Sequence, residues 1–297
     1  MTNLPSVKQL QYFVALEKHR HFGRAAAACF VSQPAFSVAI RELESVLDLK
    51  LVDRTNRKVT ITHIGSDVAT QARLVLRDLE GMVEMTRAHL APMSGPLRLG
   101  VIPTIAPFLL PRLLPKLRRR YKALKPVLFE DQTMRIYQRL MEGELDVILL
   151  ALPFELRNVE TLALFADPFY LAYRDGTSLL DPASYRVEQL PQESVLLLDD
   201  GHCLRDHALS ACRIRNVDKV SPISASSLLT LVEMVDADLG ITYLPEMALG
   251  TWLLKNTRVR TMPLKSAPKR EIGLVWRKGS TRGDEFREFG AFIRGNR

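Results

Sequence analysis

A fourteen-residue stretch, 199–212, holds the side chains of this chain best suited to redox chemistry. It contains two of the three cysteines and two of the six histidines. A cysteine reacts as its thiolate, and neighbouring cations or a helix N-terminus lower the pKa of its thiol. Cys203 directly follows His202 and precedes Arg205 by two positions, and Gly201 interrupts the strand-like run before it. We therefore expect Cys203 to stand at the start of a helix and to be a candidate nucleophile.

The spacing of the two cysteines has a mechanical consequence. Cys212 follows Cys203 by nine positions, and the residues between them are good helix formers. In a helix, this spacing separates the two Cα atoms by about 13.5 Å, at about 1.5 Å per residue. A disulfide needs Cα atoms about 4.4–6.8 Å apart. The two cysteines can bond only if the segment between them refolds, as in a redox switch.

Two other interpretations of this stretch stay open. Free cysteines in a reducing compartment are commonly small buried hydrophobic residues without a chemical role. A metal site is the other, since four potential ligands occur together, at His202, Cys203, His207 and Cys212. Their spacing does not follow the paired pattern of a structural zinc site. We expect no metal and no cofactor.

Length and composition indicate a globular protein with a polyanionic partner. The 297 residues correspond to about two domains. Hydrophobic residues make up 47% of the chain, and the net charge is +8, which favours binding to nucleic acid. No apolar run approaches the roughly 18 residues of a membrane span, and the first residues do not resemble a secretion signal. We therefore expect a cytoplasmic protein without a membrane partner, in which any disulfide is transient.

The N-terminal residues predict three helices, at Val7–Lys18, at Arg24–Cys29 and from Ser32 to about Leu47. Ser32 is a good N-cap, and Pro34 is tolerated in a first turn. The third helix has an apolar stripe, made of Phe36, Ile40, Leu43 and Leu47. Another face carries Gln33, Ser37 and Arg41 at intervals of four. These side chains could bond base edges or phosphates, as a helix in the major groove requires.

Two short strands are expected next, at Lys50–Val52 and Lys58–Thr62, joined by a turn at 54–57. Together with the helices they predict a winged helix-turn-helix. Arg54, Arg57 and Lys58 on the wing would meet phosphate. An amphipathic helix with an ordinary solvated face fits the helix pattern equally well.

A long helix is predicted from Ile64 to about Leu90, with a stripe of small and apolar residues. About 27 residues span roughly 40 Å, more than a small wing domain can cover. A second copy of the chain is the simplest cover, which implies a dimer. The segment 91–96 then breaks the helix as a hinge would.

From Leu97 onward, short strands alternate with helices. Strands are expected at 97–102, 127–130, 146–151, 195–198, 241–244 and 271–277, and helices at 105–120, 134–141 and 283–293. Such alternation predicts mostly parallel sheets covered by helices, with ligands at the carboxyl ends of strands. Thr104 and Thr133 follow two of these strands and could hydrogen-bond a small polar ligand. Each could instead be a helix N-cap.

Three segments resemble LysR-type transcriptional regulators, namely Phe22–Ala26, Val31–Ser37 and Val59–Gly65. The resemblance implies an α/β fold class, with an N-terminal winged helix-turn-helix, a long linker helix and a periplasmic-binding-protein-like effector domain of two α/β subdomains. The implied boundaries are 1–63 for DNA binding, 64–94 for the linker helix and hinge, and 95–297 for regulation. Subdomain I would cover about 95–166 and 269–297, and subdomain II about 167–268.

Within that family, Gly201–Asp206 with Cys212 resembles the OxyR subfamily of peroxide sensors, and Val101–Thr104 and Asp131–Thr133 are similar to its pocket segments. The resemblance implies that Cys203 is the peroxidatic and Cys212 the resolving cysteine. The implied peroxide pocket consists of Thr104, Thr133, His202 and Arg205. The implied DNA-binding residues are Ser32, Gln33, Pro34, Ser37, Arg41, Arg54 and Arg57.

The resulting hypothesis is a homo-oligomeric DNA-binding regulator, a dimer or tetramer, rather than an enzyme. Hydrogen peroxide would oxidise Cys203 to a sulfenic acid, which Cys212 would condense into a disulfide. The partners implied are double-stranded promoter DNA of oxidative-stress genes and RNA polymerase. Three alternatives remain: a regulator of this family that binds a small organic effector and needs neither cysteine, a metal sensor that uses both histidines, and a thiol peroxidase, whose fold would not begin with a winged helix-turn-helix.

Overall fold

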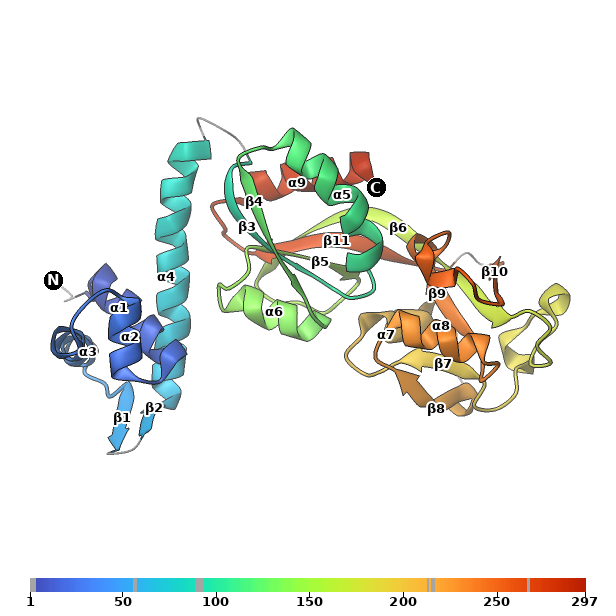
Figure 1. Ribbon diagram of the computed structural model, residues 1–297, viewed down its shortest axis with the longest axis horizontal. Coiled ribbons are helices and arrows are strands. Elements are labelled where there is room, and N and C mark those ends of the chain that lie inside the picture. The colour runs from blue at the N-terminus through green and yellow to red at the C-terminus, as the bar shows by residue number, and fades with distance from the viewer. Residues whose placement is uncertain (1–3, 56–57, 89–92, 213, 215–216, 266–267) are drawn as a thin grey trace. The chain divides into compact units, whose positions relative to one another are not determined.

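The computed structural model describes residues 4–55, 58–88, 93–212, 214, 217–265 and 268–297. The chain forms two compact units (Figure 1). The N-terminal unit comprises Met1–Pro92 with two short later segments, Met141–Glu144 and Ser280–Arg282. The C-terminal unit comprises Met93–Leu140, Leu145–Gly279 and Gly283–Arg297. The finer domain and subdomain boundaries expected from the sequence stay predictions.

The N-terminal unit is a winged helix-turn-helix followed by a long helix, as predicted. Its elements are α1 (Val7–His19), α2 (Phe22–Ala28), α3 (Gln33–Leu47), β1 (Val52–Thr55), β2 (Lys58–Ile61) and α4 (His63–Ala88). Ser32 caps α3, and its hydroxyl accepts a hydrogen bond from the amide of Ala35. The core is formed by apolar side chains of the helices, among them Phe13, Leu16, Phe36, Ile40 and Leu43.

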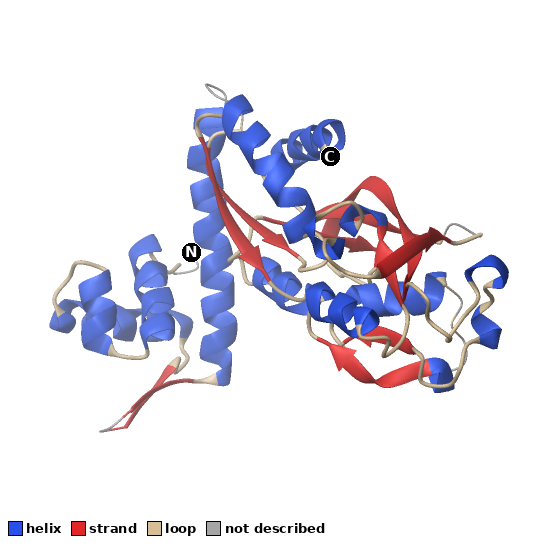
Figure 2. Cartoon of the chain, turned by 45° about the vertical axis from the view of Figure 1, so that its right-hand side comes forward, coloured by secondary structure: helices blue, strands red, loops and turns tan. Residues whose placement is uncertain are grey.

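The first strand of the wing lies later than predicted. The amides of Leu51 and Val52 both donate to Glu44 Oε1 at the end of α3. Residues 51 and 52 are therefore held against the end of the helix, and the antiparallel ladder begins with Val52 opposite Ile61. The resulting hairpin extends away from the three short helices (Figure 2).

Helix α4 has 26 residues, which corresponds to about 39 Å. Its buried positions Ala69 and Ala72 are small, and it packs closely on α1. The last two positions of the predicted helix, 89 and 90, lie outside the described residues. None of the helices in the described ranges is long and apolar enough to cross a membrane.

The C-terminal unit begins with alternating strands and helices. These are β3 (Gly95–Val101), α5 (Ala106–Arg120), β4 (Leu124–Glu130), α6 (Thr133–Met141) and β5 (Val147–Leu152). The three strands are parallel, and Figure 1 shows α5 and α6 on opposite faces of the sheet. A long strand, β6 (Val159–Arg174), leads into the second half, and β11 (Lys269–Arg277) returns from it to α9 (Gly283–Asn296).

The second half contains β7 (Val195–Leu198), α7 (Cys203–Ala211), β8 (Val220–Ala225), α8 (Leu228–Asp236), β9 (Thr242–Pro245) and β10 (Val259–Pro263). The large sheet has the order β10-β6-β11-β5-β3-β4, with β9 also paired to β6. The prediction of mostly parallel sheets is wrong for this part, because β6 and β11 are antiparallel to each of their partners. Beside them, β7 and β8 form a small parallel pair.

Two hydrophobic clusters stabilise this unit. The first is formed by β3, β5, β11, α5 and α9, and the second by β7, β9 and α8. Cys203 belongs to the first cluster, whereas Cys212 packs against the second. Helix α7 therefore carries one cysteine to each cluster.

Candidate functional site

Cys203 is the first residue of α7, as the sequence predicts. Gly201 makes this geometry possible because its φ is +94°, a value that glycine adopts readily. A Cβ on Gly201 would also lie 2.9 Å from Oε1 of Gln132. The tight turn thus brings the thiol, at the beginning of a helix, close to the segment that precedes α6.

A buried ion pair that sequence reasoning missed lies beside this thiol. Arg270 of β11 is 1% exposed, and its Nε and Nη2 each lie 2.9 Å from Oδ2 of Asp167 on β6. Its Nη1 donates to Thr104 Oγ1 at 2.9 Å, and its Nη2 to the Thr104 carbonyl at 3.0 Å. Three oxygen atoms accept from the guanidinium and the Met247 sulfur lies 3.6 Å from Nη2, so the position of the guanidinium is fixed.

Burial and charge act in opposite directions on Cys203, which is 3% exposed. Burial raises the pKa of its thiol and is the largest effect. A contact with the Thr133 hydroxyl, the charge of Arg270 and a backbone contact at Ala151 lower that pKa. The cation that most favours the thiolate is therefore Arg270, from a distant strand, rather than the flanking residues that the sequence singled out.

The Thr133 hydroxyl adds hydrogen-bonding capacity to the same site. Thr133 is the first residue of α6 and 1% exposed, and its Oγ1 has no hydrogen-bond partner of normal geometry among the described residues. A buried hydroxyl left in this state costs about 1–3 kcal/mol. The Thr104 hydroxyl accepts from Arg270, which leaves its own proton free to donate. The site thus suits a small molecule that both donates and accepts hydrogen bonds.

The two other residues expected in the pocket, His202 and Arg205, differ in burial and in their contacts. His202 occupies the N-cap position of α7 and is 6% exposed, and burial lowers the pKa of its imidazole. Arg205 points to the loop before α7, where its Nε lies 3.1 Å from Asp200 and its Nη1 donates to the Leu198 carbonyl. The structure therefore places Thr133 and Arg270 at Cys203, with Thr104 bonded to Arg270, and Arg205 holds the loop before α7.

Cys212 lies at the other end of α7, at its C-cap, and all three cysteines are free thiols. Burial raises the pKa of the Cys212 thiol to about 12. Because the two thiols occupy separate clusters at opposite helix ends, a bond between them requires α7 to unwind. No group of three or more possible metal ligands occurs within the described part of the chain.

The expected DNA-binding face lies on α3. Gln33, Pro34 and Arg41 are exposed and Ser37 is half-buried, whereas Phe36, Ile40 and Leu43 point into the core. The Ser32 hydroxyl is used as the N-cap. Arg54 lies on β1, but its side chain, like the whole of Arg57, falls outside the described residues. Their expected contacts with phosphate stay predictions.

Two family descriptions together match almost the whole chain. Residues 7–66 match the bacterial regulatory helix-turn-helix protein of the lysR family, and residues 91–297 match the LysR substrate binding domain. The first match covers α1–α3 and the wing. The second covers the unit that contains Cys203.

Several relatives are similar over nearly their full length. The chain is 39% identical to the HTH-type transcriptional regulator EstR of Acinetobacter baylyi, with 96% of this chain and 95% of the relative covered. It is also 39% identical to the transcriptional dual regulator OxyR of Escherichia coli, with coverages of 97% and 95%. Among solved structures, a full-length OxyR variant from Pseudomonas aeruginosa matches with a TM-score of 0.80 at 33% identity, over 97% of this chain and 94% of that one.

Proposed function

The chain belongs to the LysR family of transcriptional regulators, and from this premise we propose that it senses hydrogen peroxide through Cys203. It is a DNA-binding regulator rather than an enzyme. The observation that carries the proposal is the buried thiol at the start of α7, next to the Arg270 guanidinium and the unsatisfied Thr133 hydroxyl. The similarity to OxyR of Escherichia coli supports the same signal.

The reaction consumes one peroxide and two thiols. The Cys203 thiolate attacks one peroxide oxygen, the O–O bond breaks, and the departing hydroxide takes up a proton to leave as water. Cys203 is then a sulfenic acid. The Cys212 sulfur attacks the Cys203 sulfur, the S–O bond breaks, and a second water leaves as the disulfide forms.

The surrounding residues have distinct roles in this scheme. Arg270 stabilises the thiolate, and the planar guanidinium is fixed by Asp167 and Thr104. Thr133 and the free proton of Thr104 hold the peroxide against the sulfur. His202 occupies the N-cap position of α7, and Arg205 holds the preceding loop in place.

Disulfide formation changes the structure because α7 has to unwind. Residues of both hydrophobic clusters then repack, which would alter the contacts between copies of the chain in a dimer or tetramer. We infer that α4 transmits this change to the spacing of the two DNA half-sites. Promoter DNA and RNA polymerase are the partners in this scheme.

Counting free thiols by intact mass after peroxide treatment tests the proposal. Wild type should lose two thiols, Cys203→Ser none of them, and Cys212→Ser should hold one extra oxygen atom on Cys203. DNA footprints of the same samples connect the chemistry to regulation. An unchanged response of Cys203→Ser to peroxide would exclude the proposal and favour an organic effector or a metal as the signal.

A further inference from the structure

Two tyrosine hydroxyl groups meet at the second hydrophobic cluster, and the peroxide reaction uses neither of them. Tyr243 lies on β9 and is 2% exposed, whereas Tyr185 is half-buried between two short 3₁₀ helices, Pro182–Ser184 and Val187–Gln189. Their hydroxyl oxygens are 2.6 Å apart, which is a normal distance for a hydrogen bond between two hydroxyls. The bond therefore ties the segment between β6 and β7 to the sheet.

The two hydroxyls do not depend on this bond equally. The Tyr243 hydroxyl is buried and bonds no other residue that the structure describes. Tyr185 is partly exposed to water, which can replace a lost partner. A buried hydroxyl without a partner costs free energy, whereas removing both partners of a bond together costs little. Tyr243 is therefore the member that needs the bond, and Tyr185 is the residue that provides it.

Cys212 lies beside this pair of tyrosines. Cys212 and Tyr185 both pack against the cluster that contains Tyr243. Burial raises the pKa of each phenol, and a negative charge on Cys212 raises it further. The Cys212 thiol is thus close enough to act on both hydroxyls, and the pair stands at the C-terminal end of α7.

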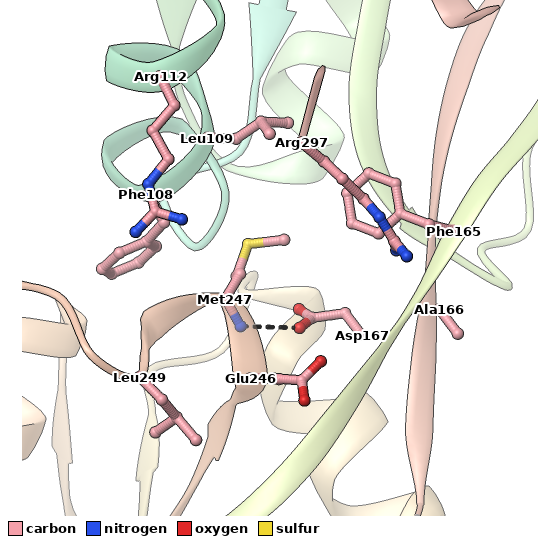
Figure 3. Close-up of a pocket in the computed structure, with 10 residues that line it drawn as sticks. All are labelled: Phe108, Leu109, Arg112, Phe165, Ala166, Asp167, Glu246, Met247, Leu249 and Arg297. Carbon is pink, nitrogen blue, oxygen red and sulfur yellow. Dashed lines mark hydrogen bonds between the residues drawn. The ribbon is translucent and has the colours of Figure 1, made fainter. Parts of the chain in front are cut away.

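The surroundings of the two thiols differ in charge. At Cys203, the Arg270 guanidinium favours the thiolate. Asp167 holds that guanidinium and accepts in turn from the Met247 amide (Figure 3). At Cys212, burial raises the pKa of the thiol to about 12. Because the thiolate is the attacking form, Cys212 becomes reactive only after it has left its cluster.

We propose that the Tyr185–Tyr243 hydrogen bond retains Cys212 in this unreactive position and so sets the lifetime of the sulfenic acid on Cys203. The inference rests on the proposed peroxide function, and both tyrosines are positioning residues because they act through Cys212. When Cys212 leaves the cluster, water reaches the two hydroxyls and their bond no longer contributes. The Cys212 sulfur then bonds to the Cys203 sulfur, and the Cys212 proton leaves as water with the hydroxyl of the sulfenic acid.

Alkylation of Cys212 in the reduced full chain tests the retention without peroxide. Cys29→Ser/Cys203→Ser leaves Cys212 as the single cysteine, and its rate of reaction with iodoacetamide measures how often the thiol leaves the cluster. Adding Tyr185→Phe leaves the Tyr243 hydroxyl buried without a partner and should accelerate alkylation about tenfold. Adding Tyr243→Phe as well removes that hydroxyl and should restore the parent rate. An unchanged rate in Tyr185→Phe, or an acceleration that Tyr243→Phe does not reverse, would overturn the inference.

Two single variants serve as controls in the same background. Tyr243→Phe alone should alkylate like its parent, because the Tyr185 hydroxyl that remains is partly exposed to water. Tyr173→Phe changes a half-buried tyrosine of β6 that packs against the same cluster, and it too should leave the rate unchanged. Acceleration by Tyr173→Phe equal to that by Tyr185→Phe would mean that any loosened tyrosine releases Cys212, which contradicts a specific role of the pair.

Trapping of the sulfenic acid tests the effect on the reaction. Chains with all native cysteines are mixed with one equivalent of peroxide and quenched in dimedone, and intact mass separates the trapped sulfenic acid from the disulfide. Tyr185→Phe should form the disulfide about tenfold faster than wild type, with the rate of Cys203 oxidation unchanged. Equal rates of disulfide formation would refute the inference. A wild-type chain whose Cys203 never reacts would instead refute the proposed function, and the alkylation rates would still decide whether the pair retains Cys212.

Discussion

Single hydroxyl groups decide how the peroxide is held at Cys203. Thr133 Oγ1 has no normal hydrogen-bond partner in the described structure, so Thr133→Val removes a group that contributes little to folding. We expect this variant to be at least as stable as wild type and to react with peroxide about tenfold more slowly, which corresponds to about 1.4 kcal/mol in the barrier. Stopped-flow measurements at equal peroxide concentration would show this. Equal rates would mean that Thr133 has no role in the reaction and is simply the first residue of α6.

Thr104 has a second task, because its hydroxyl accepts from the buried Arg270. Thr104→Val should slow oxidation by about tenfold. It should also lower the free energy of unfolding by about 1–3 kcal/mol, because a buried guanidinium loses a partner. Denaturant titration distinguishes the two threonine variants. The same loss of stability in both would show that neither has the separate role assigned here.

The sequence indicated part of this site but not its cation. Cys203 and Cys212 were recognisable because reactive residue types cluster in one short segment. Arg270 is far away in the sequence, on a strand whose neighbours read as ordinary core, and only the pairing of β11 with β6 brings it opposite Asp167. Arg205, adjacent in sequence, was the natural candidate, but its side chain is held by Asp200. The pairing of β11 with β6 is a tertiary contact that local sequence patterns do not encode, so the sequence alone did not identify Arg270.

At the level of elements, α7 is the part that has to change. His207 lies one turn after Cys203, and its Nε2 contacts the Pro153 carbonyl at 3.0 Å. Its Nδ1 is buried without a partner among the described residues, and burial lowers the pKa of the imidazole. A carbonyl only accepts, so the neutral ring carries its proton on Nε2. The contact thus ties the helix to the loop that follows β5.

This arrangement gives α7 a dependence on pH. A histidine whose pKa is lowered in the folded helix stabilises that helix above its ordinary pKa of about 6.5, and the stabilisation is lost as pH falls below this value. Reduced wild type should therefore lose stability between pH 7.5 and 5.5 faster than His207→Gln, whose amide can keep the contact without titrating. Thermal unfolding at several pH values measures the difference. Parallel pH profiles would contradict it.

Helix α3 should separate base recognition from phosphate binding. Arg41 is exposed on the face opposite the core, and Arg41→Ala, if it contacts a base, should cost about 1–3 kcal/mol at one operator position. Arg57→Ala on the wing should instead weaken binding to every sequence and lower the salt slope by about one. Titrations of specific and random DNA at several salt concentrations compare the two. Equal losses on both DNAs for Arg41→Ala would place Arg41 on phosphate.

Most helices and strands were predictable because their hydrophobic periodicity and their capping residues indicate the same element. The strand Val195–Leu198 has the predicted bounds, and α3 begins after Ser32 as expected. By contrast, β6 was missed, since Asp167–Pro168 in its middle reads as a turn. Pro168 nevertheless pairs with Lys269 as part of the strand. The tertiary role of Asp167 as the partner of Arg270 overrides this local signal.

At the scale of the whole molecule, the positive net charge and the exposed residues of α4 point to different partners. The net charge of +8 favours DNA through phosphate contacts. Helix α4 instead exposes apolar side chains at Ile64, Val75 and Met82. These positions recur within about 20° of one another at 100° per residue, so they form one stripe. The net positive charge favours binding to nucleic acid, and the apolar stripe of α4 suits contact with a second copy of the chain.

The stripe leads to a test of assembly that does not depend on peroxide. Met82 is 55% exposed and Val75 44%, so Val75→Glu/Met82→Glu should leave the fold of a single chain intact. In a dimer the same carboxylates would be buried without partners, which is strongly unfavourable. Sedimentation at matched concentration should therefore show a smaller species than wild type, whereas Ser66→Glu, on the opposite side of the same helix, should assemble normally. If the double variant kept the wild-type mass, the stripe would not be the contact between copies, and the transmission of the redox change through α4 would lose its structural basis.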